Sequence, residues 1–350
     1  MKIEKAELAG KIAKLKNVVP KKTNIPALQG ILVKDGYFTA SNLELTVKTK
    51  IEGSEGEIFL IPAKAFDLIG NLPDGEVEIS PGKNHTIMIK AAKIKNKYQT
   101  LDPETFPASS LSGDDDKEIS IDSELLLASM KRVSYAIPAQ SSSPNMSTLC
   151  LRAEDGMLNF VGLDGHVLAW DRIGYEGNFE LLIPKNTVEK LLSIGLSGEV
   201  IIKHNKNGAA FITEDYEVYT RIVDGNYFKY EKMFNQMPIH TEVTRSEFLE
   251  AVMRAKMCTE EKRPARFEIS GNEMNISIKD NTTDYNETVF LKKELAEPLT
   301  IGFDARLVVE TLKAFDCENV KIQMASPKNP MIVEVEDGDF KAIVLPVAIN

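Results

Sequence analysis

The amino-acid sequence predicts an α+β protein of three tandem, similar domains, each with two helices packed on antiparallel sheets. The first observation is a unit of strand, helix and strands that occurs three times, marked by the dipeptides Ile61-Pro62, Ile183-Pro184 and Ile301-Gly302. From 61 to 183 is 122 residues and from 183 to 301 is 118, a period that matches a small domain and exceeds a solenoid repeat. The other two observations are an amphipathic helix that opens each third of the chain and a hairpin turn that follows it.

Length and composition agree with several soluble domains. The chain has 350 residues, of which 43% are hydrophobic, so it is long for one core and can fill two or three. It contains no run of about 18 apolar residues, so we expect a soluble protein. The three cysteines, Cys150, Cys258 and Cys317, are widely spaced. This spacing supports neither a disulfide framework nor a zinc ribbon, which favours a reducing cytosol and predicts no cofactor or metal.

The three opening helices share one apolar spacing. Their apolar positions are Leu8, Ile12, Leu15 and Val19, then Leu126, Met130, Val133 and Ile137, then Phe248, Val252 and Ala255. Superposing these stripes brings Lys14, Arg132 and Arg254 into register, about 100° around the helix from the third apolar position. A basic residue at one helical position of every repeat predicts a shared function, although cations on a solvated helix face would give the same pattern.

Turn signals divide the strands that follow each helix. Hairpins are expected at Asp35-Gly36, Asp155-Gly156 and Gly271-Asn272, and at Asn207-Gly208 and Asp337-Gly338 in the later halves of the second and third repeats. Polar stretches at residues 109–121 and 235–242 mark the boundaries. The predicted domains are therefore 1–116, 117–240 and 241–350.

Basic residues are concentrated locally in an acidic chain. The formal net charge of −10 argues against a protein that wraps nucleic acid over its whole surface. Residues 1–22 nevertheless hold seven lysines against Glu4 and Glu7. Three layered domains in tandem form an arch, and two arches with complementary ends close head to tail into a two-fold ring. If the helices line its hole, the basic residues face inward.

Over its full length the chain resembles the β subunit of bacterial DNA polymerase III, the sliding clamp. The resemblance is carried by NIPALQGILV, SNLELTVK, LIPAKAF, YQTLDPETFP, LDGHVLAW, RIVDGNYFKY and FDCENVKIQM through IVLPV. It implies the DNA-clamp fold and a head-to-tail homodimeric ring of six similar domains around double-stranded DNA. It also implies a DNA polymerase processivity factor that is not an enzyme. A clamp loader opens such a ring, and replicative and repair polymerases bind it through a short peptide motif.

The resemblance and the basic helices together suggest how the duplex is held. Contacts to phosphates, without base readout, exchange easily and permit sliding. We expect this role for Lys11, Lys14, Lys22, Arg132 and Arg254. Lys22 matches a basic DNA-contacting position of the family, in the loop before NIPALQG. For each residue taken alone, a solvating surface charge is the alternative.

An apolar groove between the second and third domains is implied as the partner-peptide pocket. Matched by position, its residues are Leu163, Gly165, His166, Val167, Leu168, Phe228, Lys232, Met233, Ile343, Val344, Leu345, Pro346 and Val347. Ile343 and Val344 also fit a plain core strand. Val167 and Ser143 stand where the family usually has arginine, and Phe228 replaces a common proline. We therefore expect a less basic pocket whose preferred peptide differs from the family's acidic-aliphatic motif.

For the joints of the ring, the family pairs an edge of its first domain with the region of the third domain's opening helix. Phe106 and Met257 are the matching candidates for the dimer interface. Both residues also fit an ordinary hydrophobic core. An interface with an apolar centre and a charged rim is expected.

Two other functions fit parts of the sequence. Asp164 beside His166 could act as the acid and base of a hydrolase. The sequence lacks HExxH, GxSxG and GxxxxGK[ST] motifs, and its other histidines, His85, His204 and His240, lack ligand spacing. The second alternative is an interaction scaffold of the same fold that does not load onto DNA.

Overall fold

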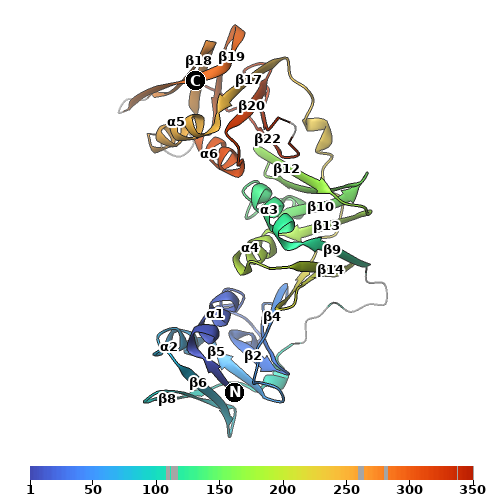
Figure 1. Ribbon diagram of the computed structural model, residues 1–350, viewed down its shortest axis with the longest axis vertical. Coiled ribbons are helices and arrows are strands. Elements are labelled where there is room, and N and C mark those ends of the chain that lie inside the picture. The colour runs from blue at the N-terminus through green and yellow to red at the C-terminus, as the bar shows by residue number, and fades with distance from the viewer. Residues whose placement is uncertain (108–110, 112–116, 259–263, 280–282, 337, 350) are drawn as a thin grey trace. The chain divides into compact units, whose positions relative to one another are not determined.

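A computed structural model describes residues 1–107, 111, 117–258, 264–279, 283–336 and 338–349. The chain forms two compact units (Figure 1), of which unit 1 comprises Met1–Leu127 with Glu189–Ile222 and unit 2 comprises Ala128–Val188 with Val223–Asn350. Helices α3 (Ser123–Ser134) and α4 (Lys185–Ile194) each begin in one unit and end in the other. The domain boundaries after residues 116 and 240 stay a prediction.

Unit 1 contains two antiparallel sheets, one with the order β1-β6-β7-β8 and the other β5-β2-β3-β4-β16-β15-β14-β9. Its helices are α1 (Lys5–Leu15) and α2 (Phe66–Gly70). The strands are β1 (Lys2–Glu4), β2 (Gly30–Lys34), β3 (Tyr37–Ser41), β4 (Leu45–Lys50), β5 (Ile58–Pro62), β6 (Glu76–Gly82), β7 (Thr86–Ala91), β8 (Ile94–Gln99), β9 (Lys117–Asp122), β14 (Glu199–Asn205), β15 (Gly208–Ile212) and β16 (Tyr216–Arg221). The pairing of β4 with β16 joins strands that are far apart in the sequence.

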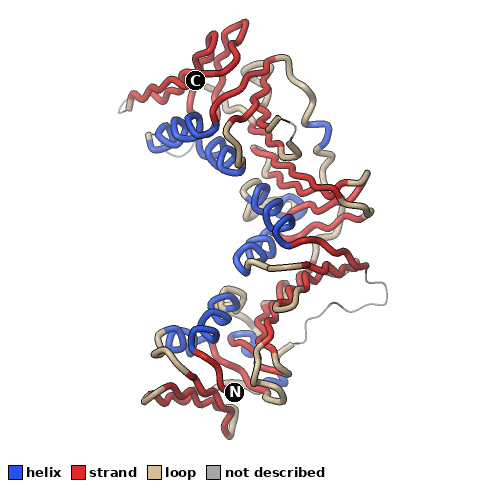
Figure 2. The backbone as a smooth tube through the Cα atoms, viewed as in Figure 1, coloured by secondary structure: helices blue, strands red, loops and turns tan. Residues whose placement is uncertain are grey.

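Unit 2 contains one antiparallel sheet with the order β13-β10-β11-β12-β22-β21-β20-β17-β19-β18. Its helices are α5 (Arg245–Met257) and α6 (Ala305–Ala314). The strands are β10 (Thr148–Glu154), β11 (Met157–Leu163), β12 (Val167–Gly174), β13 (Phe179–Pro184), β17 (Ile239–Thr244), β18 (Ala265–Lys279), β19 (Asp284–Phe303), β20 (Asn319–Met324), β21 (Met331–Glu334) and β22 (Lys341–Val344). In each unit the helices lie on one side of the large sheet (Figure 2).

The three predicted opening helices are confirmed as α1, α3 and α5. Their apolar stripes are buried, as expected for helices that pack on sheets, but Val19 and Ile137 lie beyond the last residues of α1 and α3. Lys14, Arg132 and Arg254 are each the tenth residue of their helix, so the predicted register holds. The predicted second helices form after Pro62, Pro184 and Phe303 as α2, α4 and α6, although α2 has only 5 residues.

One backbone hydrogen bond repeats at the start of each opening helix. The first N–H of a helix lacks an intrahelical acceptor, so another carbonyl must satisfy it. The three bonds are Lys5 N to Gly75 O at 2.9 Å, Ser123 N to Gly198 O at 2.9 Å and Arg245 N to Glu318 O at 2.8 Å. Each acceptor directly precedes β6, β14 or β20. The repeats therefore share their helix-to-strand connections as well as their element order.

The predicted turns have the expected backbone where the hairpins are regular. Asp35 and Gly36 between β2 and β3 have φ of 50° and 82°, and Asp155 and Gly156 between β10 and β11 have φ of 50° and 75°. Gly271, with φ of 59°, lies within β18, where the register with β19 shifts. Asp337 of the predicted Asp337-Gly338 turn lies outside the described residues. No helix among the described residues is long and apolar enough to cross a membrane.

Candidate DNA-binding and partner-binding sites

Five of the six helices of the described residues have a net positive charge, although the protein is acidic. Helix α1 has a formal charge of +2, α3, α4, α5 and α6 have +1 each, and α2 has −1. The six helices of the described residues therefore hold +5, and since the whole chain is at −10, its remaining residues hold −15. A helix with a net positive charge favours contact with a polyanion.

The lysines predicted to bind DNA on α1 are bonded to main-chain oxygens. The Nζ atom of Lys14 donates to the carbonyl oxygen of Ile194, the last residue of α4. The Nζ atom of Lys11 donates to the carbonyl oxygen of Lys50 at 2.7 Å and lies 3.7 Å from the carboxylate of Glu7. Lys22 is exposed in the loop that follows α1. Carbonyl acceptors are neutral, so the charge of Lys14 stays uncompensated by them.

The two arginines predicted to bind DNA are accessible but paired with carboxylates. The side chain of Arg132 is 41% exposed, and its Nη1 atom donates to Oδ2 of the buried Asp171 at 2.9 Å. The side chain of Arg254 is 49% exposed and forms a bidentate pair with Glu287, Nε to Oε2 at 2.8 Å and Nη2 to Oε1 at 2.6 Å. The hydrogen bonds from Arg254 lower the pKa of the Glu287 carboxyl.

A hollow lined by four cations lies between the ends of α3 and α6. The cations are Lys131, Arg132, Arg245 and Lys313, and Glu310 and Asp316 also line the hollow. Sequence reasoning identified only Arg132 in this group. Lys313 lies in α6, whose apolar spacing indicates only that this helix packs on a core. Nothing in the sequence places Lys313 beside α3.

Unit 2 brings most of the predicted partner-pocket residues together. Strand β12 pairs with β22, so that Leu168 lies opposite Ile343. Leu163, Leu168 and Ile343 belong to one buried cluster with Tyr227 and Tyr230. The N–H of Leu345 donates to the carbonyl oxygen of His166 at 2.9 Å, which joins the tail to the predicted pocket residues Gly165 and His166.

The chain beyond β22 is held against β19. The N–H of Val347 donates to the carbonyl oxygen of Gly302 at 2.8 Å. A Cβ atom at Gly302 would lie 2.6 Å from the carbonyl oxygen of Val347, so this approach requires glycine. The third repeat therefore has Ile301-Gly302 where the other two have Ile-Pro.

Alternation along the strands separates the predicted pocket residues into two groups. Neighbouring side chains of a strand point to opposite faces of a sheet. Val167 and Val344 are buried at 1% and 0% exposure and face away from the cluster that holds Leu168 and Ile343. They contribute backbone to this region, whereas Leu345, which is half-buried, packs against the cluster.

Residues 223–237 cover the edge of the buried cluster. The predicted residues Phe228 and Met233 are 43% and 44% exposed on this segment. Lys232, directly before Met233, is also exposed. Sequence reasoning missed the half-buried residues that pack on the same cluster, which are Met146, Trp170, Val223, Phe234 and Met237. The single tryptophan of the chain is the one signal that could have identified this group.

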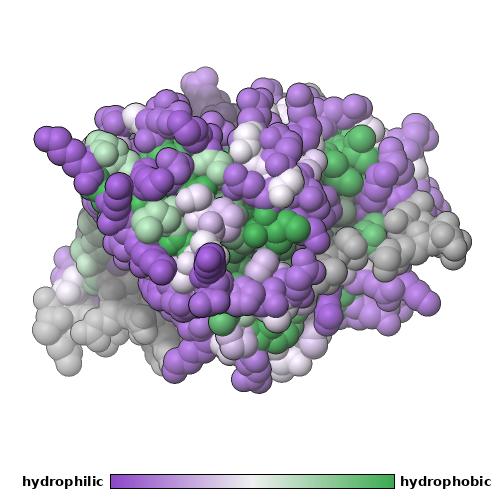
Figure 3. Space-filling view, turned by 90° about the horizontal axis from the view of Figure 1, so that it is seen from below, coloured by the Kyte–Doolittle hydropathy of each residue, from purple (hydrophilic) through white to green (hydrophobic). Residues whose placement is uncertain are grey.

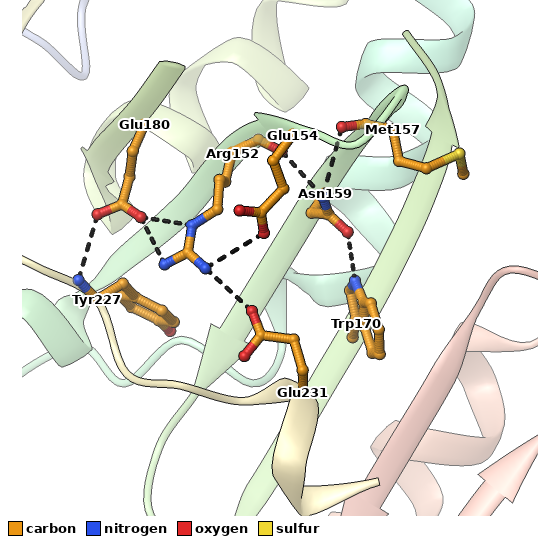
Figure 4. Close-up of polar contacts among 8 residues, drawn as sticks. All are labelled: Arg152, Glu154, Met157, Asn159, Trp170, Glu180, Tyr227 and Glu231. Atoms are coloured by element: carbon orange, nitrogen blue, oxygen red, sulfur yellow. Dashed lines mark hydrogen bonds and ion pairs between the residues drawn. The ribbon is translucent and has the colours of Figure 1, made fainter. Parts of the chain in front are cut away.

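Arg152 on β10 holds this segment in place (Figure 4). Its guanidinium pairs with Glu180 on β13 and with Glu231 at 3.0 Å, and Glu180 also accepts the backbone N–H of Tyr227 at 3.3 Å. The guanidinium lies 5.4 Å from the ring centre of Tyr230, within the range of a cation–π interaction. One side chain from the sheet therefore contacts Tyr230 and Glu231 directly, and Tyr227 through Glu180, in the segment that carries Phe228, Lys232 and Met233.

Trp170 completes the support of this segment. Its ring centre lies 5.2 Å from that of Tyr230 and 5.3 Å from that of Phe234. Its Nε1 atom donates to Oδ1 of Asn159 at 2.9 Å, and Asn159 donates in turn to the carbonyl oxygen of Arg152 at 3.1 Å. The indole ring and the main chain of Arg152 are thus linked through the side-chain amide of Asn159.

Asp164 has a structural part in the turn before β12. Its Oδ1 atom accepts the backbone N–H groups of His166 and Val167, both at 2.8 Å. A carboxylate that caps a turn in this way is not positioned to relay a proton to the imidazole of His166. This geometry gives no support to the hydrolase alternative.

The two dimer-interface candidates differ in exposure. Met257, at the end of α5, is 78% exposed, so it is not a core residue. Phe106 is half-buried and lines a hollow with Tyr37, Lys48 and Glu217. At the end of unit 1 that carries β6 and β8, hydrophobic residues form separate patches among hydrophilic ones (Figure 3).

Comparison with known proteins gives one consistent result. The N-terminal domain of the DNA polymerase III beta subunit family matches residues 1–110, and the C-terminal domain of that family matches residues 235–348. The beta sliding clamp of Vibrio cholerae is 21% identical over 99% of this chain and 98% of its own length, and that of Bacillus subtilis is 22% identical with the same coverage.

Solved structures share the fold at low sequence identity. The DNA polymerase sliding clamp from Bacillus subtilis superposes with a TM-score of 0.91 at 20% identity, covering 100% of this chain and 99% of that one. The DNA polymerase beta subunit from Streptococcus pyogenes gives a TM-score of 0.90 at 19% identity, with 99% of each chain covered.

Repeated helix pairs on antiparallel sheets, with positive charge gathered on the helices, define a DNA clamp. The matched family domains together span more than half of the chain. The chain belongs to the family of bacterial DNA polymerase III beta subunits, the beta sliding clamps, which are DNA polymerase processivity factors.

Proposed function

We propose that this chain forms a homodimeric ring around duplex DNA, is opened by a clamp loader, and tethers replicative and repair polymerases through short peptide motifs. It has no catalytic site of its own and acts in the cytoplasm. The observation that carries this proposal is the charge separation between the helices, at +5, and the rest of the chain, at −15. Helices that bind phosphates without reading bases give contacts that exchange as the ring moves.

Two edge strands and Met257 support the proposed ring joints. Strand β8 is the last strand of the smaller sheet in unit 1, and β18 is the last strand of the sheet in unit 2. An edge strand presents unpaired N–H and C=O groups that can pair with another chain. Head-to-tail contact between unit 1 of one copy and unit 2 of another, with Phe106 and Met257 as the candidate contact residues, would close a two-fold ring.

Retention on circular DNA tests the encirclement. After loading by a clamp loader, the protein should stay on a nicked circle at salt concentrations that remove electrostatic binders, and should leave once the circle is cut. A ring is held by topology, whereas phosphate contacts weaken steeply with salt. Equal loss from circular and linear DNA would instead favour the scaffold that does not load.

Charge reversal tests the predicted DNA-binding residues. Replacing Lys14, Arg132 and Arg254 by glutamate should impair loading and leave a native mass of about twice 38.9 kDa. The unchanged mass is the control for the dimer joints. Dissociation of this variant into single chains would contradict the assignment of these residues to DNA.

A further inference from the structure

One strand position carries the partner of the helix arginine in the second and third repeats. Asp171 on β12 accepts from Arg132, and Glu287 on β19 accepts from Arg254. The register places this position opposite a buried apolar residue in every repeat: Thr49 opposite Phe38, Asp171 opposite Phe160, and Glu287 opposite Ile276. In the second and third repeats the tenth helix residue therefore pairs with this strand position.

The first repeat differs at this position because it has Thr49 in place of a carboxylate. The hydroxyl of Thr49 lies 3.5 Å from Nζ of Lys11. Lys11 and Lys14 both donate to main-chain carbonyls, and Lys11 also lies 3.7 Å from the carboxylate of Glu7, which is 49% exposed and on the same helix. Neutral acceptors do not cancel a lysine charge, so these two carbonyl bonds leave the charges of Lys11 and Lys14 in place.

The carboxylates of the other two repeats occupy the guanidinium groups. Arg254 gives Nε and Nη2 to Glu287, and its Nη1 atom lies 3.5 Å from Glu250. Arg132 gives Nη1 to Asp171, whose side chain is 2% exposed. Carboxylates and phosphates accept from the same edges of a guanidinium, so a phosphate must displace the carboxylate to form a bidentate pair.

We propose that Asp171 and Glu287 attenuate DNA binding by competing with duplex phosphates for Arg132 and Arg254. This inference rests on the proposed function. The first repeat, which lacks such a carboxylate, supplies the stronger phosphate contacts, and the second and third repeats hold the duplex loosely. The two carboxylates therefore set how tightly Arg132 and Arg254 hold the duplex. They also keep the exchange between phosphate contacts fast.

Glu287→Gln in the full-length protein tests the attenuation. Glutamine keeps the shape of the side chain and one acceptor but removes the charge that competes with phosphate. Equilibrium binding to a labelled linear duplex is measured over a range of salt concentrations by fluorescence anisotropy. The slope of log affinity against log salt should steepen by about 0.9, the value for one added phosphate contact.

Glu268→Gln is the matched control, because it changes the net charge equally and removes the partner of Arg266 on β18. It should leave the slope at the wild-type value. Adding Arg254→Gln to Glu287→Gln should also return the slope to about that of the wild type. Equal slopes for Glu287→Gln and Glu268→Gln, or a steepening that persists without Arg254, would overturn the proposal.

Asp171→Asn provides a second test in the other repeat, with circular dichroism to check that the buried site still folds. The same steepening is expected, and Glu287→Gln decides the question if Asp171→Asn unfolds. Failure of the wild-type protein to remain on a closed circle would refute the proposed function. Normal wild-type retention with unchanged slopes in the variants would refute only the attenuation.

Discussion

Lys190 donates its Nζ hydrogen to the carbonyl oxygen of Lys14, while Lys14 donates its own Nζ hydrogen to the carbonyl oxygen of Ile194. The carbonyl of Lys14 lies in the last turn of α1, and Ile194 ends α4. The last carbonyls of a helix lack intrahelical donors and carry partial negative charge. A lysine of each helix therefore caps the C-terminus of the other.

Lys190 should make the fold more stable as the pH rises toward 10.5. Burial, followed by the charge of Lys14, lowers the pKa of Lys190 below its ordinary 10.5. Between the lowered pKa and 10.5 the unfolded chain binds more protons at this group than the folded chain, so the free energy of unfolding rises with pH in that window. Urea unfolding of the wild type and Lys190→Met, from neutral pH to above 10.5, should show the wild type gaining relative to the variant. A difference that does not change with pH would contradict this.

Glu287 should contribute stability that is lost in acid. Its pKa is lowered below 4.5 because Arg254 donates to the carboxylate, so the contribution is complete above 4.5 and disappears as the pH falls through the lowered value. Acid unfolding of the wild type and of Glu287→Gln, followed by circular dichroism, should converge at low pH. Parallel curves throughout would mean that this carboxylate is not linked to folding.

Arg152→Met should loosen the segment of residues 223–237. Loss of its ion pairs leaves the partly buried carboxylate of Glu180 and the exposed carboxylate of Glu231 without their cation, which costs about 2 kcal/mol of unfolding free energy. A labelled peptide rich in aliphatic residues, chosen because it binds the wild type, should bind more weakly, while DNA binding stays unchanged. Arg266→Met, which breaks an exposed pair with Glu268, is the matched control and should cost less than about 0.5 kcal/mol. Unchanged peptide binding in Arg152→Met would show that Arg152 does not contribute to the peptide-binding pocket.

Variants at Ile343 and Leu345 should distinguish a residue of the hydrophobic core from a residue of the peptide-binding surface. Ile343 is 2% exposed, so Ile343→Ala should lower the free energy of unfolding by about 2 to 4 kcal/mol. Leu345 is half-buried at the edge of the same cluster, so Leu345→Ala should cost about 1 kcal/mol and mainly weaken the peptide. Chemical denaturation and peptide anisotropy measure the two effects. Equal losses of stability would assign Leu345 to the core as well.

Lys22 should contribute one phosphate contact. It is exposed in the loop after α1, so Lys22→Gln should reduce the salt slope of duplex binding by about 0.9 without a change in stability. Lys93→Gln, at an exposed lysine in the turn between β7 and β8, removes the same charge elsewhere in unit 1. The two variants should differ in slope, and identical slopes would show that only the overall charge matters.

The repeats could be predicted from the sequence because their signals are local. Apolar residues at helical spacing fixed α1, α3 and α5, and the Asp-Gly turns fixed the hairpins around residues 35 and 155. The helix register of Lys14, Arg132 and Arg254 followed from the same spacing. These features depend on neighbours within about ten residues.

The partners of the cations could not be predicted in this way. Arg132 meets Asp171 and Arg254 meets Glu287 across more than thirty residues, and the pairing depends on how β12 and β19 lie under their helices. The role of Arg152 was missed for the same reason, because Glu180 and Glu231 approach it only in the folded sheet. Which face of a strand is buried, as for Val167, also required the register.

The sheets continue across the middle of the chain, with β16 paired to β4 and β12 paired to β22. A fragment cut at residues 117 and 240 would lose both of these neighbours. Strands β12 and β16 would then be edge strands, and their unpaired N–H and C=O groups could pair with strands of other molecules. The central third is therefore a poor candidate for expression by itself, and attempts to isolate it should give aggregates rather than a folded monomer.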